Sequence, residues 1–188
     1  FLPVTAHGVK LLSMGLLINE ADPVAVRGPL ATRYVQQFLR NVAWGDVDFL
    51  ILDLPPGTGA IQLTIVQTAE LDGVVVVTTP QEVALIDARK AIGLFERVET
   101  PILGIIENMS YFQCPSDGKI YHSFGEGGGE REAAKLGVPL LGKIPLDIST
   151  RSGGDEGRPV ALEDPGQNPV SAAFRQVAEQ CARVVLDR

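Results

Sequence analysis

The chain has 188 residues, of which 45% are hydrophobic and 21% charged. These proportions are those of an ordinary globular domain and exclude a disordered chain, because enough apolar side chains are present to form a core. Its 16 Lys and Arg residues against 23 Asp and Glu residues give a net charge of −7. This acidic balance argues against nucleic acid or an anionic membrane surface as a partner.

Two cysteines, Cys114 and Cys181, lie far apart in the sequence. They do not form the framework of a disulfide-stapled protein, so we expect a reducing compartment and predict a cytoplasmic protein. No apolar run is long enough to cross a membrane. The chain opens Phe1-Leu2-Pro3-Val4, without Met, and a strand-like run follows almost at once. We therefore interpret it as part of a longer protein.

Short apolar runs alternate with segments of helical periodicity. Runs of Val, Ile and Leu are typical of buried parallel strands, and apolar residues spaced three and four apart indicate helices packed on them. The alternation predicts an α/β fold, in which a mostly parallel sheet carries helices on both faces. In chain order we expect a strand at 9–18, a helix at 29–42, a strand at 49–54, a helix at 61–70, a strand at 73–79, a helix at 83–98, strands at 102–107 and 139–144, and a helix at 169–186.

Two segments interrupt this alternation. Residues 111–129 are rich in Gly, Ser and aromatic side chains, and we expect a loop or a small hairpin. Residues 149–168 are rich in Gly, Pro and Asp, which predicts an ordered surface loop.

The first functional candidate is a carboxylate at the end of an apolar run. Asp53 ends the run at 49–54 and leads into a turn with two prolines and two glycines. Ligands of open α/β sheets bind at the carboxyl ends of strands, where a carboxylate can hold Mg²⁺ through water. Gly57 and Gly59 would let backbone amides approach a phosphate. A plainer alternative is that Asp53 caps the next helix.

A phosphate-binding loop of the pattern G-x-x-x-x-G-K-[ST] does not occur in these 188 residues. Residues 137–143 have the glycine spacing, but Ile144 stands where Ser or Thr is needed, and the stretch lies along a predicted strand rather than in a loop between a strand and a helix. The glycine-rich residues 125–129 could bind an anion at a helix N-terminus. Glu126 and Glu130 would repel it, so we favour a flexible turn.

Three further candidates follow later strands or lie in the irregular segment. Asn108 comes directly after the run at 102–107, and its amide could recognise an adenine edge, although by itself a cap or turn role is favoured. Asp147 follows the next strand and has the sequence context of a helix N-cap. Cys114 lies in the irregular segment, where a lone cysteine is more often a small buried residue than a ligand.

Taken together, seven motifs resemble one family. They are RGP at 27–29, DLPPGTG at 53–59, TTPQ at 78–81, ENMSYF at 107–112, FGEGGG at 124–129, LGKIPLD at 141–147 and DEGRP at 155–159. In this order they resemble the Mrp/ApbC family of iron–sulfur cluster carrier ATPases, which are relatives of MinD and of the nitrogenase iron protein. The resemblance covers nearly the whole chain.

The resemblance implies a P-loop ATPase that uses ATP and Mg²⁺, works as a homodimer and carries a [4Fe–4S] cluster to apo iron–sulfur proteins. It implies a catalytic, magnesium-side role for Asp53, and Gly57 and Gly59 match the proline–glycine switch that follows this carboxylate in the family. Cys114 matches the first cysteine of the family's Cys-Pro-x-Cys cluster motif. The residues that match the nucleotide site are Gly57, Gly59, Asn108, Pro145 and Asp147.

The chain departs from this family at three points. The family's phosphate-binding loop precedes every motif seen here, so we expect residues 1–188 to be the C-terminal part of a single P-loop NTPase domain that lacks its first strand–loop–helix unit, and to be inactive as an ATPase alone. Ala60 stands where the family usually has Asp, which would weaken the switch. Asp117 replaces the second cluster cysteine, in the expected cluster-site segment at about 109–129.

Three hypotheses remain open from the sequence. Cys114 and the adjoining Met-Ser-Tyr-Phe segment favour a cluster carrier. Asp117 favours a MinD-like, ATP-dependent dimerisation switch or scaffold that carries no cluster. The third possibility is an inactive fragment.

Overall fold

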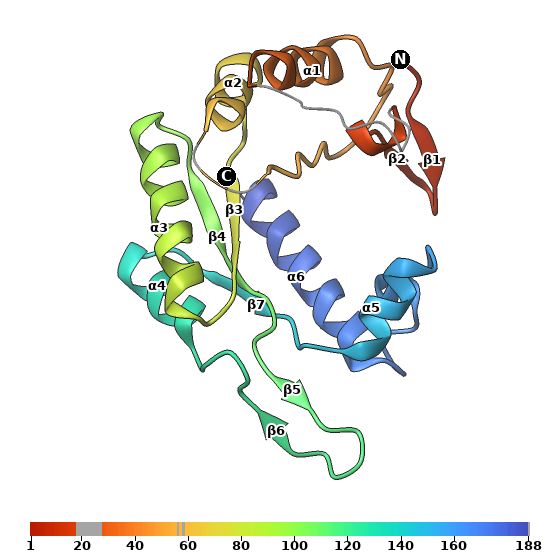
Figure 1. The fold of residues 1–188 in the computed structure, drawn as a ribbon, viewed down its shortest axis with the longest axis vertical. Coiled ribbons are helices and arrows are strands. Elements are labelled where there is room, and N and C mark those ends of the chain that lie inside the picture. Colours follow the sequence, from red (N-terminus) through yellow and green to blue (C-terminus); the bar gives the residue numbers. More distant parts are fainter. Residues whose placement is uncertain (18–27, 56, 58, 188) are drawn as a thin grey trace. The chain divides into compact units, whose positions relative to one another are not determined.

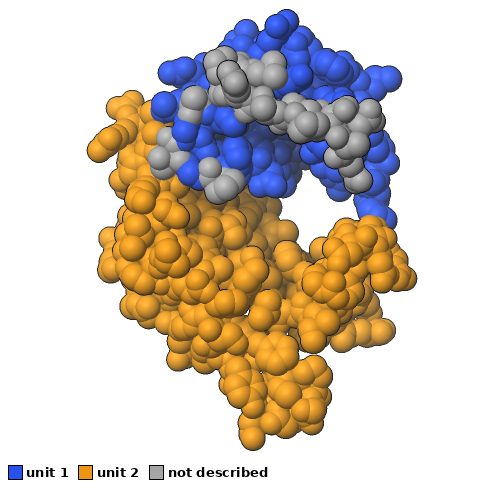
Figure 2. Space-filling view, in the orientation of Figure 1, with its two compact units in different colours: residues 1–71 blue, residues 72–188 orange. Residues whose placement is uncertain are grey.

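The computed structural model describes residues 1–17, 28–55, 57 and 59–187. The chain divides into two compact units, Phe1–Leu71 and Asp72–Arg188, which Figure 2 shows in different colours. Each unit is described by itself. None of the helices in the described ranges is both long and apolar enough to cross a membrane.

The first unit is a small hairpin followed by a pair of helices. Strands β1 (Val4–Ala6) and β2 (Val9–Leu11) pair antiparallel, and a short 3-10 turn, η1 (Met14–Leu16), follows. Helix α1 (Gly28–Arg40) packs against α2 (Ala60–Thr68). Both helices were predicted, α1 from a proline suited to the first turn of a helix and α2 from its apolar spacing.

Two predicted strands are wrong in this unit. Only the first three residues of the run at 9–18 are a strand; Ser13 then caps the 3-10 turn, and residue 18 lies outside the described residues. Residues 49–54 form no strand, and Ile51 is 87% exposed. A strand needs a neighbour to pair its backbone N–H and C=O groups. No strand in the described part of the chain pairs with this run, so Asp53 does not end a strand.

The second unit contains the sheet. Strands β3 (Val74–Thr78), β4 (Ile102–Glu107) and β7 (Leu140–Lys143) run parallel in the order β3-β4-β7. Helices α3 (Glu82–Arg97) and α4 (Gly128–Leu136) lie on one face and α6 (Pro169–Leu186) on the other (Figure 1). This confirms the predicted α/β fold. The core is formed by Val76, Ile92, Ile105 and Ala133.

Two connections complete the second unit. Strands β5 (Phe112–Gln113) and β6 (Ile120–Tyr121) form the small hairpin expected between 111 and 129. The predicted loop at 149–168 is wrong, because α5 (Ile148–Asp155) and a 3-10 turn, η2 (Val160–Leu162), occupy much of it. Asp147 starts α5 by accepting a hydrogen bond from the Thr150 amide at 2.7 Å, which outweighs the helix-weakening glycines that follow.

A partly buried ion pair joins α3 to α4. The Nε and Nη2 atoms of Arg89 donate to the two carboxylate oxygens of Glu132 at 2.9 and 2.6 Å. Lys135 donates to the same carboxylate at 2.9 Å, and Glu132 is only 5% exposed. The hydrogen bonds from Arg89, with help from Lys135, lower the pKa of Glu132 to about 2.

We expect Glu132→Gln to lower the free energy of unfolding by about 2 kcal/mol at neutral pH, because the amide leaves Arg89 without its buried charge partner. The folded pKa of about 2 lies below the ordinary 4.5, so this stabilisation is complete above the ordinary pKa and is lost as the pH falls toward the folded one. Urea unfolding at neutral and acidic pH should therefore show a smaller acid-induced loss in the variant. Glu179→Gln, at an exposed position of α6, is the control. Equal acid sensitivity of Glu132→Gln and the unmutated chain would contradict the stabilising role and the lowered pKa of Glu132.

Candidate functional site

The carboxyl ends of the three parallel strands lie beside one another in the second unit. Thr78 pairs with Glu107, and Glu107 pairs with Lys143. The backbone N–H of Asn108 donates a hydrogen bond to the Thr78 carbonyl oxygen at 2.7 Å, so the residues after β4 stay close to the end of β3. This edge is where open α/β sheets bind their ligands.

Asn108 lies half-buried at this edge, as the sequence predicted. Its side-chain oxygen accepts a hydrogen bond from the Met109 amide at 2.9 Å. That contact fixes the side chain and is the turn role that the sequence left open. The side-chain Nδ2 atom of Asn108 can still donate hydrogen bonds, which suits recognition of a base edge.

Pro145 and Asp147 follow β7 at the same edge. One oxygen of Asp147, Oδ2, accepts hydrogen bonds from the Thr150 amide at 2.7 Å, from the Thr150 hydroxyl at 3.1 Å and from the Ser149 hydroxyl. Burial raises the pKa of Asp147, but these hydrogen bonds outweigh it and the net shift is downward. The helix-cap role is therefore confirmed, and a ligand role stays a prediction.

Cys114 lies at the turn of the β5–β6 hairpin, which extends away from the sheet (Figure 1). The Cys114 amide donates to the Lys119 carbonyl at 2.9 Å and the Gly118 amide donates to the Cys114 carbonyl at 2.8 Å, which closes the turn. The Cys114 Sγ atom lies 3.0 Å from the Ser116 hydroxyl, and this contact lowers the pKa of the thiol. The turn thus presents a thiol that ionises more readily than usual.

Asp117 shares this turn with Cys114. Its Oδ1 atom accepts a hydrogen bond from the Lys119 amide at 3.1 Å, and its Oδ2 atom lies 3.4 Å from the Lys119 ammonium. The hydrogen bond from the Lys119 amide is the main cause of the lowered pKa of Asp117, and a contact with Cys114 adds to it. A thiol and a carboxylate, two iron-binding groups of different hardness, therefore lie within one turn.

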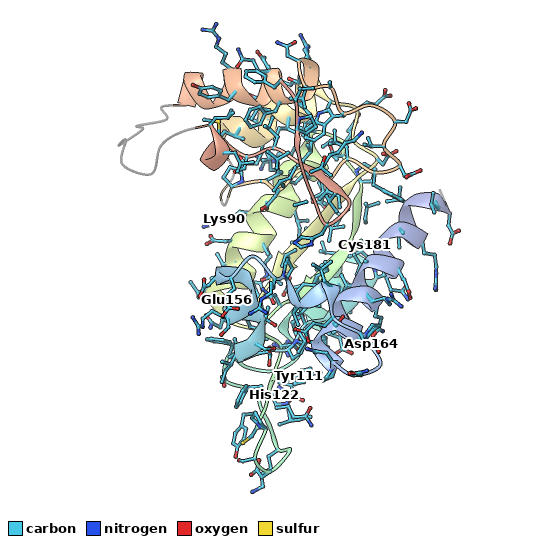
Figure 3. All side chains as sticks on the ribbon, turned by 90° about the vertical axis from the view of Figure 1, so that its right-hand side faces the viewer. Lys90, Tyr111, His122, Glu156, Asp164 and Cys181 are labelled. Atoms are coloured by element: carbon cyan, nitrogen blue, oxygen red, sulfur yellow. The ribbon has the colours of Figure 1, made fainter. Side chains whose placement is uncertain are left out.

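One hairpin does not supply enough ligands for a [4Fe–4S] cluster, which usually takes four thiolates. The described residues contain no group of three or more His, Cys, Asp or Glu side chains placed to hold a metal. His122 lies near Tyr111 at the base of the hairpin, and its Nδ1 atom is 3.4 Å from the Ser110 carbonyl oxygen (Figure 3).

The remaining predicted residues belong to the first unit. Asp53 is exposed, and Gly57 has a φ of 100°, a conformation that favours glycine. Gly59 is the N-cap of α2 and offers no side chain to cap it. The Gln62 side chain donates to the Pro55 carbonyl at 2.8 Å and holds the turn against the helix. Helix α2 begins at Ala60 and has no acidic residue in its first turn.

The sequence favoured a flexible turn at the glycine-rich residues 125–129, and this prediction is wrong. Gly128 and Gly129 are buried in the first turn of α4. A Cβ atom on Gly128 would lie 2.5 Å from the Pro80 carbonyl oxygen, and one on Gly129 would lie 3.1 Å from the Cβ atom of Glu107. These glycines let the helix approach the strand ends. Residues 137–143 likewise form a helix end and strand β7, which confirms that they are not a phosphate loop.

Sequence reasoning missed Glu107, the last residue of β4. Its side chain is fully buried, and its carboxylate accepts hydrogen bonds from the Ser110 hydroxyl at 2.5 Å and the Gly129 amide at 2.7 Å. The available signal was its place in an otherwise apolar strand, because a buried charge there requires hydrogen-bond partners.

The fold is that of MinD-like P-loop NTPases. A nucleotide-binding protein of Archaeoglobus fulgidus, solved in complex with ADP, superposes with a TM-score of 0.70 at 38% sequence identity. The superposition covers 84% of this chain and 61% of the Archaeoglobus protein. The cell division ATPase MinD of Pyrococcus furiosus gives a TM-score of 0.60 at 23% identity, over 81% of this chain and 59% of that one. The second similarity concerns the fold alone.

The sequence model of the ParA group described as NUBPL iron-transfer P-loop NTPase matches residues 1–182, and the chain belongs to this family. An iron-sulfur cluster carrier protein of Pyrococcus furiosus is 47% identical over 172 residues, which are 92% of this chain and 58% of the relative. A mitochondrial iron-sulfur protein of Arabidopsis thaliana, required for NADH dehydrogenase, is 45% identical over 97% of this chain and 58% of its own length. The chain thus spans less than two thirds of both relatives.

Proposed function

We propose that this chain is part of an ATP-dependent iron–sulfur cluster carrier, which acts as a cytoplasmic homodimer and delivers a [4Fe–4S] cluster to apo iron–sulfur proteins. The observation that carries the proposal is the place of Cys114, at the turn of a projecting hairpin in a chain of an iron-transfer family. Residues 1–188 would belong to one nucleotide-binding domain.

The cargo would be held between two copies of the hairpin. Each copy would contribute the Cys114 thiolate and the Asp117 carboxylate, which makes four donors per dimer. The lowered pKa of Cys114 favours the thiolate, the form that binds iron. A carboxylate is a harder ligand and suits iron–sulfur clusters less well. The cluster would therefore be labile, which is compatible with a carrier because a carrier must release its cargo.

The nucleotide-binding roles are proposed for each unit by itself. Asp53 would hold Mg²⁺ through water as the catalytic carboxylate, and the backbone around Gly57 and Gly59 would contact phosphate at the uncapped start of α2. Asn108 would contact the base beside Pro145 and Asp147. ATP, when bound, would supply the free energy that couples cluster transfer to a change between two states.

A second candidate is a MinD-like dimerisation switch that carries no cluster. The observation in its favour is Asp117, which leaves each hairpin with a single thiol. Both candidates need nucleotide, so cluster content distinguishes them.

Anaerobic reconstitution of the protein with iron and sulfide tests the cargo site. We expect Cys114→Ala to lose most of the bound iron and sulfide per dimer, together with the thiolate-to-iron charge-transfer absorbance, because the remaining carboxylates bind the cluster poorly. Cys181→Ala is the matched control, since that thiol lies in α6, where burial raises its pKa. Equal iron in Cys114→Ala and the unmutated protein would exclude Cys114 as a ligand and favour the switch.

A further inference from the structure

Glu107 is a buried carboxylate that forms no direct ion pair within the described residues, although Lys143 lies opposite it on β7. It has no exposed surface, and none of the ion pairs formed by the described residues includes it. A buried charge is unfavourable unless hydrogen bonds compensate for its lost hydration. Here the compensation comes from the Ser110 hydroxyl and from an amide in the first turn of α4, where the helix dipole also favours a negative charge.

These two partners are the ends of one segment. Residues 109–129 leave the sheet, form the β5–β6 hairpin and return to start α4. Ser110 stands at the beginning of this segment and Gly129 at its end. Each donates to a different oxygen of Glu107, at 2.5 and 2.7 Å. A single carboxylate therefore fastens both ends of the segment that contains Cys114.

The start of α4 leaves no free space around this contact. A Cβ atom on Gly129 would lie 3.1 Å from the Cβ and 3.2 Å from the Oε2 atom of Glu107. One on Gly128 would lie 2.5 Å from the carbonyl oxygen of Pro80, which follows β3. The helix start is thus held directly against the ends of β3 and β4, so movement of Gly129 away from Glu107 would disturb both.

The same stretch is tied to the end of β7. The Ser110 amide donates to the Ile144 carbonyl at 3.0 Å, and the Leu146 amide donates to the Tyr111 carbonyl at 2.7 Å. These bonds flank Pro145, which is proposed to line the nucleotide base. Residues 107–111 therefore adjoin both the proposed nucleotide edge and the base of the hairpin.

We propose that Glu107 is a positioning residue, which holds the Cys114 hairpin in a fixed place relative to the nucleotide-binding edge by fastening both ends of residues 109–129. The inference rests on the proposed function for the role of Cys114, but the fastening itself can be measured without a cluster. Loss of one contact would free the end of the segment while the sheet stays folded.

Glu107→Gln removes one contact with little change of shape. The amide oxygen can still accept from Ser110, whereas the NH₂ group would face the Gly129 amide, so that two donors meet. We expect amide hydrogen exchange in residues 108–130 of the full chain to become about ten-fold faster, with no change in β3 and α3. Glu126→Gln, an exposed carboxylate of the same segment, is the control and should leave exchange unchanged.

Ser110→Ala provides a second test that leaves no buried donor without a partner. It should accelerate exchange in the same segment, and the absence of acceleration in both Glu107→Gln and Ser110→Ala would overturn the proposal. Uniform acceleration throughout the chain in both variants would also overturn it, because the role would then be general stability.

The reconstituted protein supplies the functional readout. We expect chelator to remove iron several-fold faster from Glu107→Gln than from Glu126→Gln at equal starting iron content, and equal rates would overturn the positioning role. Failure of the proposed function has a different signature: Cys114→Ala would keep its iron, whereas the exchange difference between Glu107→Gln and Glu126→Gln would persist.

Discussion

Gly104→Ala is expected to lower the free energy of unfolding by about 3 kcal/mol, because the central strand has no room for a side chain there. A Cβ atom would lie 2.7 Å from both the Pro139 carbonyl oxygen and the Leu141 Cγ atom. The φ angle of 156° adds backbone strain for any residue with a side chain. Urea unfolding followed by circular dichroism measures the change.

Gly93→Ala is the matched control for this substitution. Gly93 lies within α3, and a Cβ atom there would meet no atom within 4 Å. Alanine should stabilise the helix by about 0.5–1 kcal/mol, because it loses less backbone entropy on folding. Opposite signs for the two substitutions are expected, and a Gly104→Ala chain as stable as the unmutated one would contradict the packing described for β4.

Asp117→Cys should make the reconstituted cluster about ten-fold more resistant to removal by chelator, since each hairpin would then offer two soft thiolates in place of one thiolate and one carboxylate. The measurement is the decay of the charge-transfer absorbance after chelator is added under anaerobic conditions. Asp155→Cys adds a thiol at an exposed position of α5 and serves as the control.

Only a thiol added in the hairpin turn should slow the decay of the charge-transfer absorbance. Equal resistance in Asp117→Cys and the unmutated protein would remove the basis for a labile cluster held with help from Asp117. Resistance gained equally by Asp155→Cys would show that any added thiol suffices.

The sequence was sufficient for those elements that carry their own local signal. The apolar runs that became β3, β4 and β7, and the helical spacing that became α3 and α6, were predicted to within a few residues. Residues 49–54 also form a short apolar run, but a strand forms only where a neighbouring strand pairs with its backbone N–H and C=O groups. The pattern of one run carries no information about that neighbour.

In the candidate site, too, some residues could be predicted from the sequence and others could not. That Asn108 and Pro145 share a sheet edge followed from parallel strands, and the hairpin around Cys114 followed from composition. Glu107 could not be assigned, because its partners Ser110 and Gly129 are brought together only by the folded segment. The glycines of α4 were misread for the same reason, since their requirement is a long-range contact with Pro80 and Glu107.

Cluster transfer is the most direct test of the carrier proposal. The reconstituted protein is mixed anaerobically with an apo-enzyme whose activity requires a [4Fe–4S] cluster, in the presence of a chelator that captures free iron. We predict that enzyme activity appears with the unmutated protein and is largely absent with Cys114→Ala. Activity that the chelator abolishes for both proteins, as it does for free iron and sulfide, would contradict the proposal that this chain carries and delivers a cluster.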